Sequence, residues 1–268
     1  LRRYNPILLL SFKKFTSYTP TMTEITSEVV NQVLYIRFNR PEKMNALTRD
    51  MYGELVRLLN EAAGDFAIRA VVLGTTGDHF TAGNDIMDFM NNPPSSEDST
   101  VAAFLAALLD FPKPLIASVK GNAVGVGTTM LLHCDVVIAQ QGTSFSMPFT
   151  SLGLVPEAGS TLLFPSLVGY QRAAKIFMTG EPFTAEYARE IGLVAEVAAD
   201  ADGEAKAIAE RIAAQPPSAV INTKALMKAS KHEAVAAVMK AEFQLFALAL
   251  ESEEFADAAM KFMSKKSK

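Results

Sequence analysis

The segment 115–139, LIASVKGNAVGVGTTMLLHCDVVIA, carries the clearest signal of the fold. It begins with Leu115–Val119, five small and apolar residues that predict a buried strand. A glycine-rich turn over residues 121–127 follows and opens an apolar helix that runs to about Leu132. Residues 136–139, Val-Val-Ile-Ala, predict the next strand. Strand, turn, helix and strand in so short a span indicate an α/β protein built from crossover units.

The chain on the N-terminal side of this segment repeats the same alternation. Thr48 is predicted to cap an amphipathic helix, because apolar residues recur after it at helical spacing. Short apolar runs that end in Gly, Asn or Pro predict further strands. The expected elements are strands at 33–38 and 70–74, helices at 48–63 and 101–109, and a mobile polar segment at 91–96.

The C-terminal third has a different pattern. After about Pro182 the predicted strands thin out, and helices are expected at 185–191, 202–214, 219–228 and 232–250. We therefore divide the chain into a leader or disordered tail at 1–23, an α/β core at 24–200 and a helical C-terminal region at 201–268. The helical region is expected to pack on the core or on a neighbouring subunit.

Composition excludes several classes of protein. The 268 residues are 49% hydrophobic and 20% charged, which is an ordinary globular composition. A net charge of −4 and a pI of about 5.5 argue against a nucleic-acid partner. One cysteine and three scattered histidines allow no internal disulfide and argue against a metal site. The longest apolar runs fall far short of the roughly 20 residues of a membrane span.

Residues 1–23 are basic, contain no acid and are rich in Ser and Thr. An organelle transit peptide has this composition. The alternative is a translated leader ahead of a start at Met22. The expected location is the cytoplasm if the protein is bacterial, with a mitochondrial matrix address through the basic segment as the alternative.

Glu157 is the most unusual polar residue of the sequence. It lies in GLVPEAGS, residues 153–160, with apolar residues on both sides. A lone acid in an apolar loop indicates either a structural ion pair, for example with Arg172, or a catalytic group with a shifted pKa.

Two loops follow predicted strands and carry glycines, residues 80–86 and 121–127. Each is explained by a tight turn when taken alone. Together, two backbone N–H groups that converge on one oxygen would form an oxyanion hole. Residues 121–127 do not fit a phosphate-binding P-loop, since no Lys-Ser or Lys-Thr follows.

Four motifs in order resemble the crotonase superfamily of enoyl-CoA hydratases and isomerases. They are NRPEKMNALT at 39–48, HFTAGNDI at 79–86, KGNAVGVGTTMLLHCDVVIA at 120–139 and GLVPEAGSTLLFPSLVGYQRAAKIFMTGEPFTAEYAREIGLVAEV at 153–197. The resemblance implies a spiral of repeated β-β-α units with a helical C-terminal trimerisation region. It also implies an acyl-CoA substrate, no cofactor apart from the coenzyme A of that substrate, and a homotrimer or dimer of trimers.

The resemblance assigns site residues by position. The two N–H donors that stabilise a thioester enolate would be Asn84 and Val126. Contacts to coenzyme A and the substrate would come from Lys43, Met44, Ala46, Ala82, Asp85, Ile86, Phe262 and Lys265, the last two less securely matched.

The sequence departs from the hydratases of the family at both catalytic acids. Thr129 and Phe149 stand where those enzymes carry glutamates, and both residues are expected to line the substrate site. Glu157 matches an acid of the peroxisomal-type Δ3,Δ2-enoyl-CoA isomerases. The resemblance therefore favours an isomerase of fatty acid β-oxidation with Glu157 as its single base.

Two alternatives stay open at this point. One is another acyl-CoA reaction of the family, such as hydration, dehalogenation, decarboxylation or hydrolysis, and the other is a non-catalytic relative that binds coenzyme A or RNA. Residues near the site also have plain structural interpretations. Thr129 would pack in its helix, Asp85 would shape its loop, and His133 and Cys134 would belong to the core.

Overall fold

The computed structural model describes residues 24–93 and 99–266. Its main sheet has six strands in the order β1-β2-β3-β4-β6-β9. Strand β1 is antiparallel to β2, and every other neighbouring pair is parallel. The strands are β1 (Ile25–Val30), β2 (Val33–Phe38), β3 (Ala70–Thr75), β4 (Leu115–Val119), β6 (Val136–Gln140) and β9 (Glu196–Ala198).

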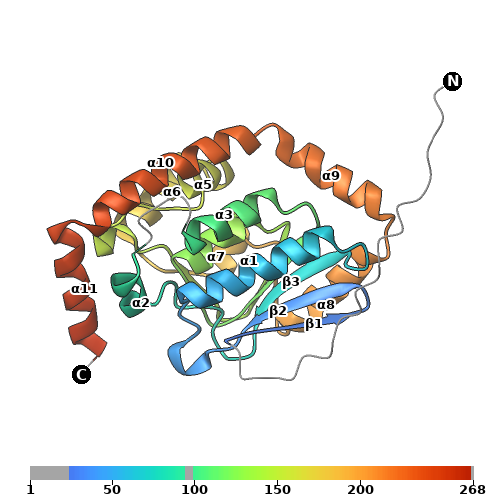
Figure 1. Ribbon diagram of the computed structural model, residues 1–268, viewed down its shortest axis with the longest axis horizontal. Coiled ribbons are helices and arrows are strands. Elements are labelled where there is room, and N and C mark those ends of the chain that lie inside the picture. Colours follow the sequence, from blue (N-terminus) through green and yellow to red (C-terminus); the bar gives the residue numbers. More distant parts are fainter. Residues whose placement is uncertain (1–23, 94–98, 267–268) are drawn as a thin grey trace.

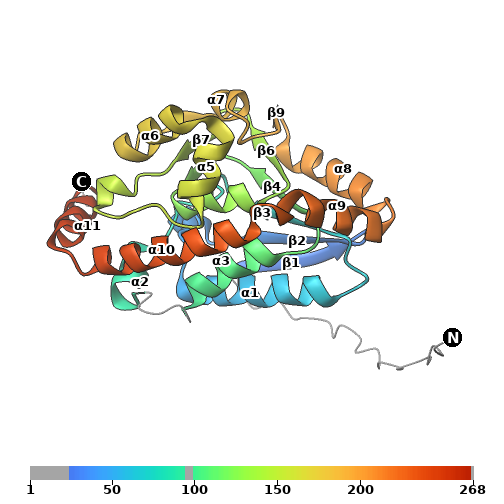
Figure 2. The same ribbon diagram turned by 90° about the horizontal axis from the view of Figure 1, so that it is seen from above.

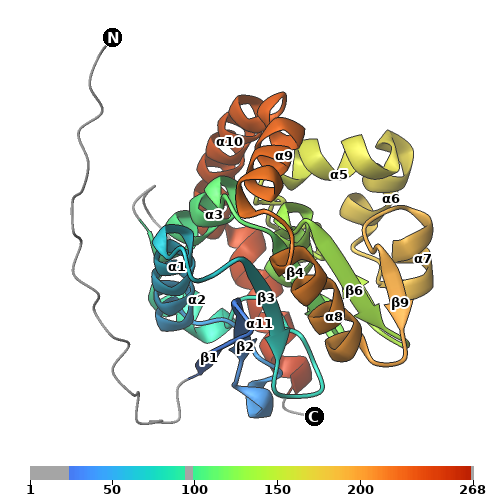
Figure 3. The same ribbon diagram turned by 90° about the vertical axis from the view of Figure 1, so that its right-hand side faces the viewer.

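The middle of this sheet is buried on both faces. Every residue of β3 and β4 is buried, as expected for parallel strands that helices cover on both sides. Helices α1 (Arg49–Gly64) and α3 (Thr100–Asp110) pack together and bury apolar side chains against one face. Helix α8 (Ala201–Ala213) lies across the other face, where four alanines allow close approach (Figures 1 and 3).

A second sheet of three strands has the order β5-β7-β8. Its strands are β5 (Asn122–Val124), β7 (Ser144–Ser146) and β8 (Phe183–Thr184). The glycine-rich turn therefore contains a strand that the sequence analysis missed. A three-residue strand has no period of its own and forms only because its partner β7 lies alongside. The helix after it is α4 (Val126–Thr129), which continues as the 3₁₀ helix η2 (Met130–His133).

The remaining helices form a second layer at one end of the sheet and a long arm over it (Figure 2). Helix α10 lies beside α3 and α5, and α11 contacts the short helix η3. Their bounds are η1 (Pro41–Lys43), α2 (Ile86–Asn91), η3 (Thr150–Leu152), α5 (Ser160–Val168), α6 (Tyr170–Thr179), α7 (Ala185–Glu190), α9 (Pro217–Ala229), α10 (His232–Leu250) and α11 (Glu253–Lys266).

Several predictions fall outside the described residues. The leader at 1–23, with the address that it would carry, is one of them, and residues 94–96 of the mobile segment predicted at 91–96 are another. The division of the chain at residue 200 stays a prediction, although α8 packs on the core sheet. None of the described helices is both long and apolar enough to cross a membrane.

Candidate active site

Three loops meet at the C-terminal ends of β2, β3 and β4, which are neighbours in the sheet. In open parallel sheets this end is where ligands bind. The loops span residues 39–48, 76–85 and 120–126, and they contain the candidate coenzyme A and oxyanion residues. The fold thus brings together the first three motifs of the sequence.

Asn45 holds the first loop in place. It is fully buried with φ 55°, a left-handed conformation that Asn tolerates better than most residues. Its side chain donates to Thr75 Oγ1 and His79 O, both at 2.7 Å, and accepts from the N–H of Arg40 at 2.7 Å. One buried amide therefore ties the first loop to the second.

Asp85 is a structural acid, as the sequence analysis expected. It caps α2 by accepting from the N–H groups of Met87 and Asp88, and it pairs with Arg40 at 2.7 Å. Burial raises the pKa of this carboxyl, but its hydrogen bonds and the charge of Arg40 outweigh burial and lower the pKa overall. A carboxylate held in this way is a poor proton acceptor.

The N–H of Asn84 faces away from the first loop. Leu47 bonds to the residues on either side of Asn84, donating to Gly83 O and accepting from Asp85 N–H. In a parallel bridge, successive N–H groups point to opposite sides, so the N–H of Asn84 lies on the side opposite Leu47. Val126 is the first residue of α4, where an N–H has no acceptor within its own helix.

The second and third loops lie in direct contact. Thr81 forms a parallel bridge with Ala123, donating to Asn122 O and accepting from Val124 N–H. A Cβ atom on Gly83 would lie 2.8 Å from Val124 O, and one on Gly127 would lie 2.4 Å from Thr81 Cγ2. Glycine is thus required at both positions by close approach, rather than only by a turn.

Tyr52 on α1 supports the second loop. Its hydroxyl donates to Oδ1 of Asn84, and its ring packs against Phe104 at 5.3 Å between centroids. Burial, and then the charge of Glu157, raises the pKa of Tyr52 well above 10. Sequence reasoning placed Tyr52 in an amphipathic helix and missed this role.

Glu157 is buried, with 7% of its surface exposed. Its Oε1 accepts a hydrogen bond from Thr129 Oγ1, and its Oε2 is buried without a hydrogen-bond partner among the described residues. The pKa of Glu157 is raised from 4.5 to about 8, and burial is the largest cause. The hydrogen bond from Thr129 lowers this pKa, and the charge of Glu242 raises it.

The structural ion pair considered for Glu157 does not form. Arg172 is half exposed and lies 3.9 Å from Glu190. Thr129 packs in its helix as expected, but its hydroxyl also donates to Glu157, which the sequence analysis did not foresee. Glu157 is therefore an acid held in an apolar site by one hydroxyl, and a group with such a pKa is a candidate for proton transfer near neutral pH.

The turn after Glu157 has an unusual backbone. Ala158 and Gly159 both have left-handed conformations, with φ 65° and φ 68°. His133 donates from Nε2 to Ala158 O at 2.7 Å. Burial lowers the pKa of His133 to about 4, so the ring is neutral and belongs to the core, as expected. It supports the turn and does not compete as a base.

Phe149 closes one side of the third loop. It is 5% exposed, and its ring would lie 4.0 Å from a Cβ on Gly125, the residue before Val126. A phenyl ring therefore lies beside the residue that precedes Val126. This wall is apolar and has no proton to transfer.

The candidate coenzyme A residues lie around the first two loops. Lys43 and Met44 are exposed, and Met44 O accepts from Ala82 N–H at 2.9 Å. Ala46 O accepts from Arg40 Nη1 at 2.9 Å, and Ile86 is the first residue of α2. Phe262 and Lys265 lie in α11, and their contribution to a ligand site stays a prediction.

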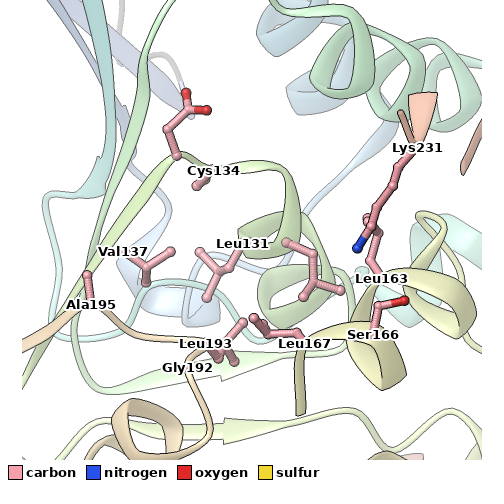
Figure 4. Close-up of a pocket in the computed structure, with 12 residues that line it drawn as sticks. Leu131, Cys134, Val137, Leu163, Ser166, Leu167, Gly192, Leu193, Ala195 and Lys231 are labelled. Atoms are coloured by element: carbon pink, nitrogen blue, oxygen red, sulfur yellow. The ribbon is translucent and has the colours of Figure 1, made fainter. Parts of the chain in front are cut away.

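A separate pocket of about 300 Å³ lies between η2, α5 and the segment before β9 (Figure 4). Five of its twelve lining residues are leucines, and the Lys231 side chain reaches toward Leu163 and Ser166 at its edge. Its lining contains neither Glu157 nor the candidate N–H donors, so it is not the site described above. In the described part of the chain, no group of three His, Cys, Asp or Glu side chains could hold a metal ion.

Comparison with known proteins identifies the family. The family model described as enoyl-CoA hydratase/isomerase matches residues 28–268. Human enoyl-CoA delta isomerase 2 is 35% identical over 254 residues, which cover 91% of this chain but only 64% of that relative. The 2,3-dehydroadipyl-CoA hydratase of Escherichia coli K12 is 33% identical over 91% of this chain and 97% of its own length.

Solved structures agree with this assignment. The structure of Pseudomonas aeruginosa OdaA has a TM-score of 0.87 and 43% sequence identity, and it covers 90% of this chain and 98% of its own. This chain therefore belongs to the enoyl-CoA hydratase/isomerase family and has the crotonase fold.

Proposed function

We propose that the protein is a Δ3,Δ2-enoyl-CoA isomerase in which Glu157 is the only proton-transferring group. Ionised Glu157 removes a proton from C2 of a 3-enoyl-CoA, and the electron pair moves onto the thioester oxygen. The resulting dienolate is delocalised from the oxygen to C4. Glu157 then returns the proton to C4, and the double bond ends between C2 and C3. Atoms and charge balance without a cofactor.

The N–H groups of Asn84 and Val126 would stabilise the oxyanion of this intermediate. One such donor typically lowers a barrier by about 2.7–4 kcal/mol. Support comes from the contact between the two loops and from the Asn84 N–H, which faces away from the first loop. The pKa of about 8 gives Glu157 a basicity suited to removing a weakly acidic proton.

The observation that carries the proposal is the chemistry around Glu157. Hydration needs a positioned water and, in the hydratases resembled here, two acid-base groups. Thr129 and Phe149 occupy the positions of those acids, and Phe149 keeps the neighbouring wall apolar. A single buried carboxylate with one oxygen free of hydrogen bonds among the described residues fits proton transfer within one substrate. The name of the human relative, a delta isomerase, agrees with this choice.

The substrate and assembly are part of the same proposal. An acyl-CoA would bind over the first two loops, with Lys43 and Met44 at the exposed edge. The product is a conjugated 2-enoyl-CoA, so the reaction belongs in the oxidation of unsaturated fatty acids. A homotrimer or a dimer of trimers is proposed from the family resemblance.

One optical assay separates the isomerase from a hydratase, because conjugation of the double bond with the thioester raises ultraviolet absorbance. With trans-3-hexenoyl-CoA, the isomerase makes absorbance rise. With crotonyl-CoA, a hydratase makes absorbance fall. We expect a fast rise with the first substrate and little change with the second. A fall with crotonyl-CoA and no rise with hexenoyl-CoA would assign hydration instead.

A further inference from the structure

One face of α10 packs against the turn that carries Glu157. Val235, Glu242 and Phe246 are 3%, 4% and 5% exposed, and their spacing places them on one stripe of the helix. A Cβ on Gly159 would lie 2.7 Å from Val235 Cγ1 and 3.2 Å from Met239 Cγ. The helix and the turn are therefore in van der Waals contact, which only glycine at position 159 permits.

Glu242 is the charged member of this buried stripe. Its Oε2 accepts from Gly159 N–H at 2.6 Å. Its Oε1 accepts from Thr161 N–H at 2.8 Å and from Thr161 Oγ1 at 2.6 Å. Both oxygens accept hydrogen bonds, which suits an ionised carboxylate. A glutamine would turn one of these acceptors into a donor that faces an N–H.

The turn needs such support because its backbone is costly. A left-handed conformation at a non-glycine residue such as Ala158 is unfavourable, because its Cβ atom crowds the following carbonyl oxygen. His133 holds Ala158 from one side, and Glu242 holds Gly159 and Thr161 from the other. Glu157 directly precedes this doubly anchored turn, so the anchors fix the direction of its side chain.

We propose that Glu242 is a positioning residue that holds the Glu157 carboxylate over the reacting atoms, and that docking of α10 therefore assembles the active site. The inference rests on the proposed function of Glu157. Glu242 does not touch the substrate in this account. It acts through Gly159 and Thr161, 83 and 81 residues away in the sequence.

Other ionisable groups near Glu157 do not share this role. The hydroxyl of Tyr52 on α1 donates to Asn84, and its pKa, raised first by burial and then by the charge of Glu157, keeps it neutral. His133 on η2 is neutral above its lowered pKa of about 4. Among the described residues, Glu242 is the one whose charge acts on Glu157, and it raises the pKa of Glu157 after burial has done so. Removal of this charge should thus lower that pKa.

The test compares Glu242→Gln and Glu242→Asp with the wild type, using trans-3-hexenoyl-CoA. For Glu242→Gln we expect kcat to fall at least about tenfold with KM within about twofold, since misplacing a catalytic group by 1 Å can cost about 10²-fold. The rising limb of the pH–rate profile should move to lower pH. Glu242→Asp keeps the charge, so its limb should stay in place while kcat recovers only in part.

Glu233→Gln is the matched control, because Glu233 is exposed on the same helix. This variant should keep the wild-type kcat and KM, and the rising limb of its pH–rate profile should stay in place. If Glu242→Gln fails to fold, Thr161→Val removes one of the three hydrogen bonds and should lower kcat severalfold. The inference would be overturned if a folded Glu242→Gln kept the wild-type kcat and the rising limb of its pH–rate profile did not move. It would also be overturned if Thr161→Val kept the wild-type kcat.

A second readout does not depend on turnover. Carbon-13 labelling of glutamate side chains allows the titration of Glu157 to be followed by NMR, with Glu157→Gln identifying its signal. A midpoint that falls in Glu242→Gln supports the contact even if the wild type does not isomerise hexenoyl-CoA, in which case only the proposed reaction fails. An unchanged midpoint overturns the inference whatever the activity.

Discussion

Oγ1 of Thr129 donates a hydrogen bond to Oε1 of Glu157, and this contact joins α4 to the turn before α5. The same short helix begins with Val126, whose N–H is a proposed oxyanion donor. The proposed donor Val126 and Thr129, the residue that holds the base, are therefore three residues apart on one helix. A shift of α4 would move both together.

Replacing Thr129 with Val should move the pH dependence of the reaction. The lost hydrogen bond favours ionised Glu157, so its loss raises the pKa of Glu157 further above the wild-type value of about 8. The rising limb of kcat/KM should move to higher pH by about one unit, since a hydrogen bond to a charged group is worth about 1.5–3 kcal/mol. Thr129→Ser keeps the hydroxyl and should keep the limb, whereas a limb unmoved in both variants would refute the role of this contact.

The burial of Glu157 should also appear in the pH dependence of stability. Its folded pKa of about 8 lies above its ordinary value of 4.5, so the folded state holds the proton more tightly. The stability from this group is complete below about pH 4.5 and is lost as pH rises to about 8. Glu157→Gln cannot titrate and should gain stability relative to the wild type by up to a few kcal/mol between pH 5 and 9. Urea unfolding of both proteins at pH 5 and pH 9 measures this gain. The prediction is contradicted if the free energies of unfolding of Glu157→Gln and the wild type differ by the same amount at both pH values.

Tyr52→Phe should remove a hydrogen bond that holds the second loop, while the phenyl ring keeps the core packing. The variant leaves Oδ1 of Asn84 without its donor, which costs about 1–3 kcal/mol for a buried acceptor. We expect kcat to fall severalfold because the Asn84 N–H is less well placed. Asn84→Ala keeps the backbone donor. When the free energies of unfolding are measured, the double variant of Tyr52→Phe and Asn84→Ala should show a coupling energy between the two positions. Strict additivity would mean that the hydroxyl and the amide act independently.

Gly83→Ala should separate the second and third loops, which carry the two proposed oxyanion donors. A Cβ there would lie 2.8 Å from Val124 O, and φ is 86°. Gly142 gives a matched control, because it has φ 81° and a Cβ on it would meet no other atom within 4 Å. Both variants carry the backbone cost of about 1–2 kcal/mol, but only Gly83→Ala should lower kcat, by about tenfold or more. Equal kcat values in the two variants would show that contact between the loops does not matter.

The regular parts of the fold could be predicted from the sequence. Leu115–Val119 is a strand as expected, and α10 begins and ends where its apolar period indicated. Long elements with a clear hydrophobic period can be predicted from the local sequence alone. Strands β5 and β8 do not, because two or three residues have no period and exist only through their partners. Helix α5 was missed as well, and it contains Pro165 in its interior.

The candidate site also has one part that could be predicted from the sequence and one part that could not. Glu157 stood out because a single acid in an apolar loop is visible in the sequence alone. Its contacts are not visible there, since Thr129 is 28 residues away and Glu242 lies on a C-terminal helix. Side-chain pairs of this kind depend on tertiary packing, which no local pattern encodes. The charge patterns on α10 gave no sign that one of its glutamates would be buried.

The most direct test of the central claim is the rate of isomerisation of trans-3-hexenoyl-CoA by Glu157→Gln beside the wild type. Glutamine has nearly the same size but cannot accept the C2 proton, so kcat should fall by about 10² or more while KM changes little. Circular dichroism and urea unfolding confirm that the variant is folded. A folded variant with kcat within about threefold of the wild type would contradict the assignment of Glu157 as the base.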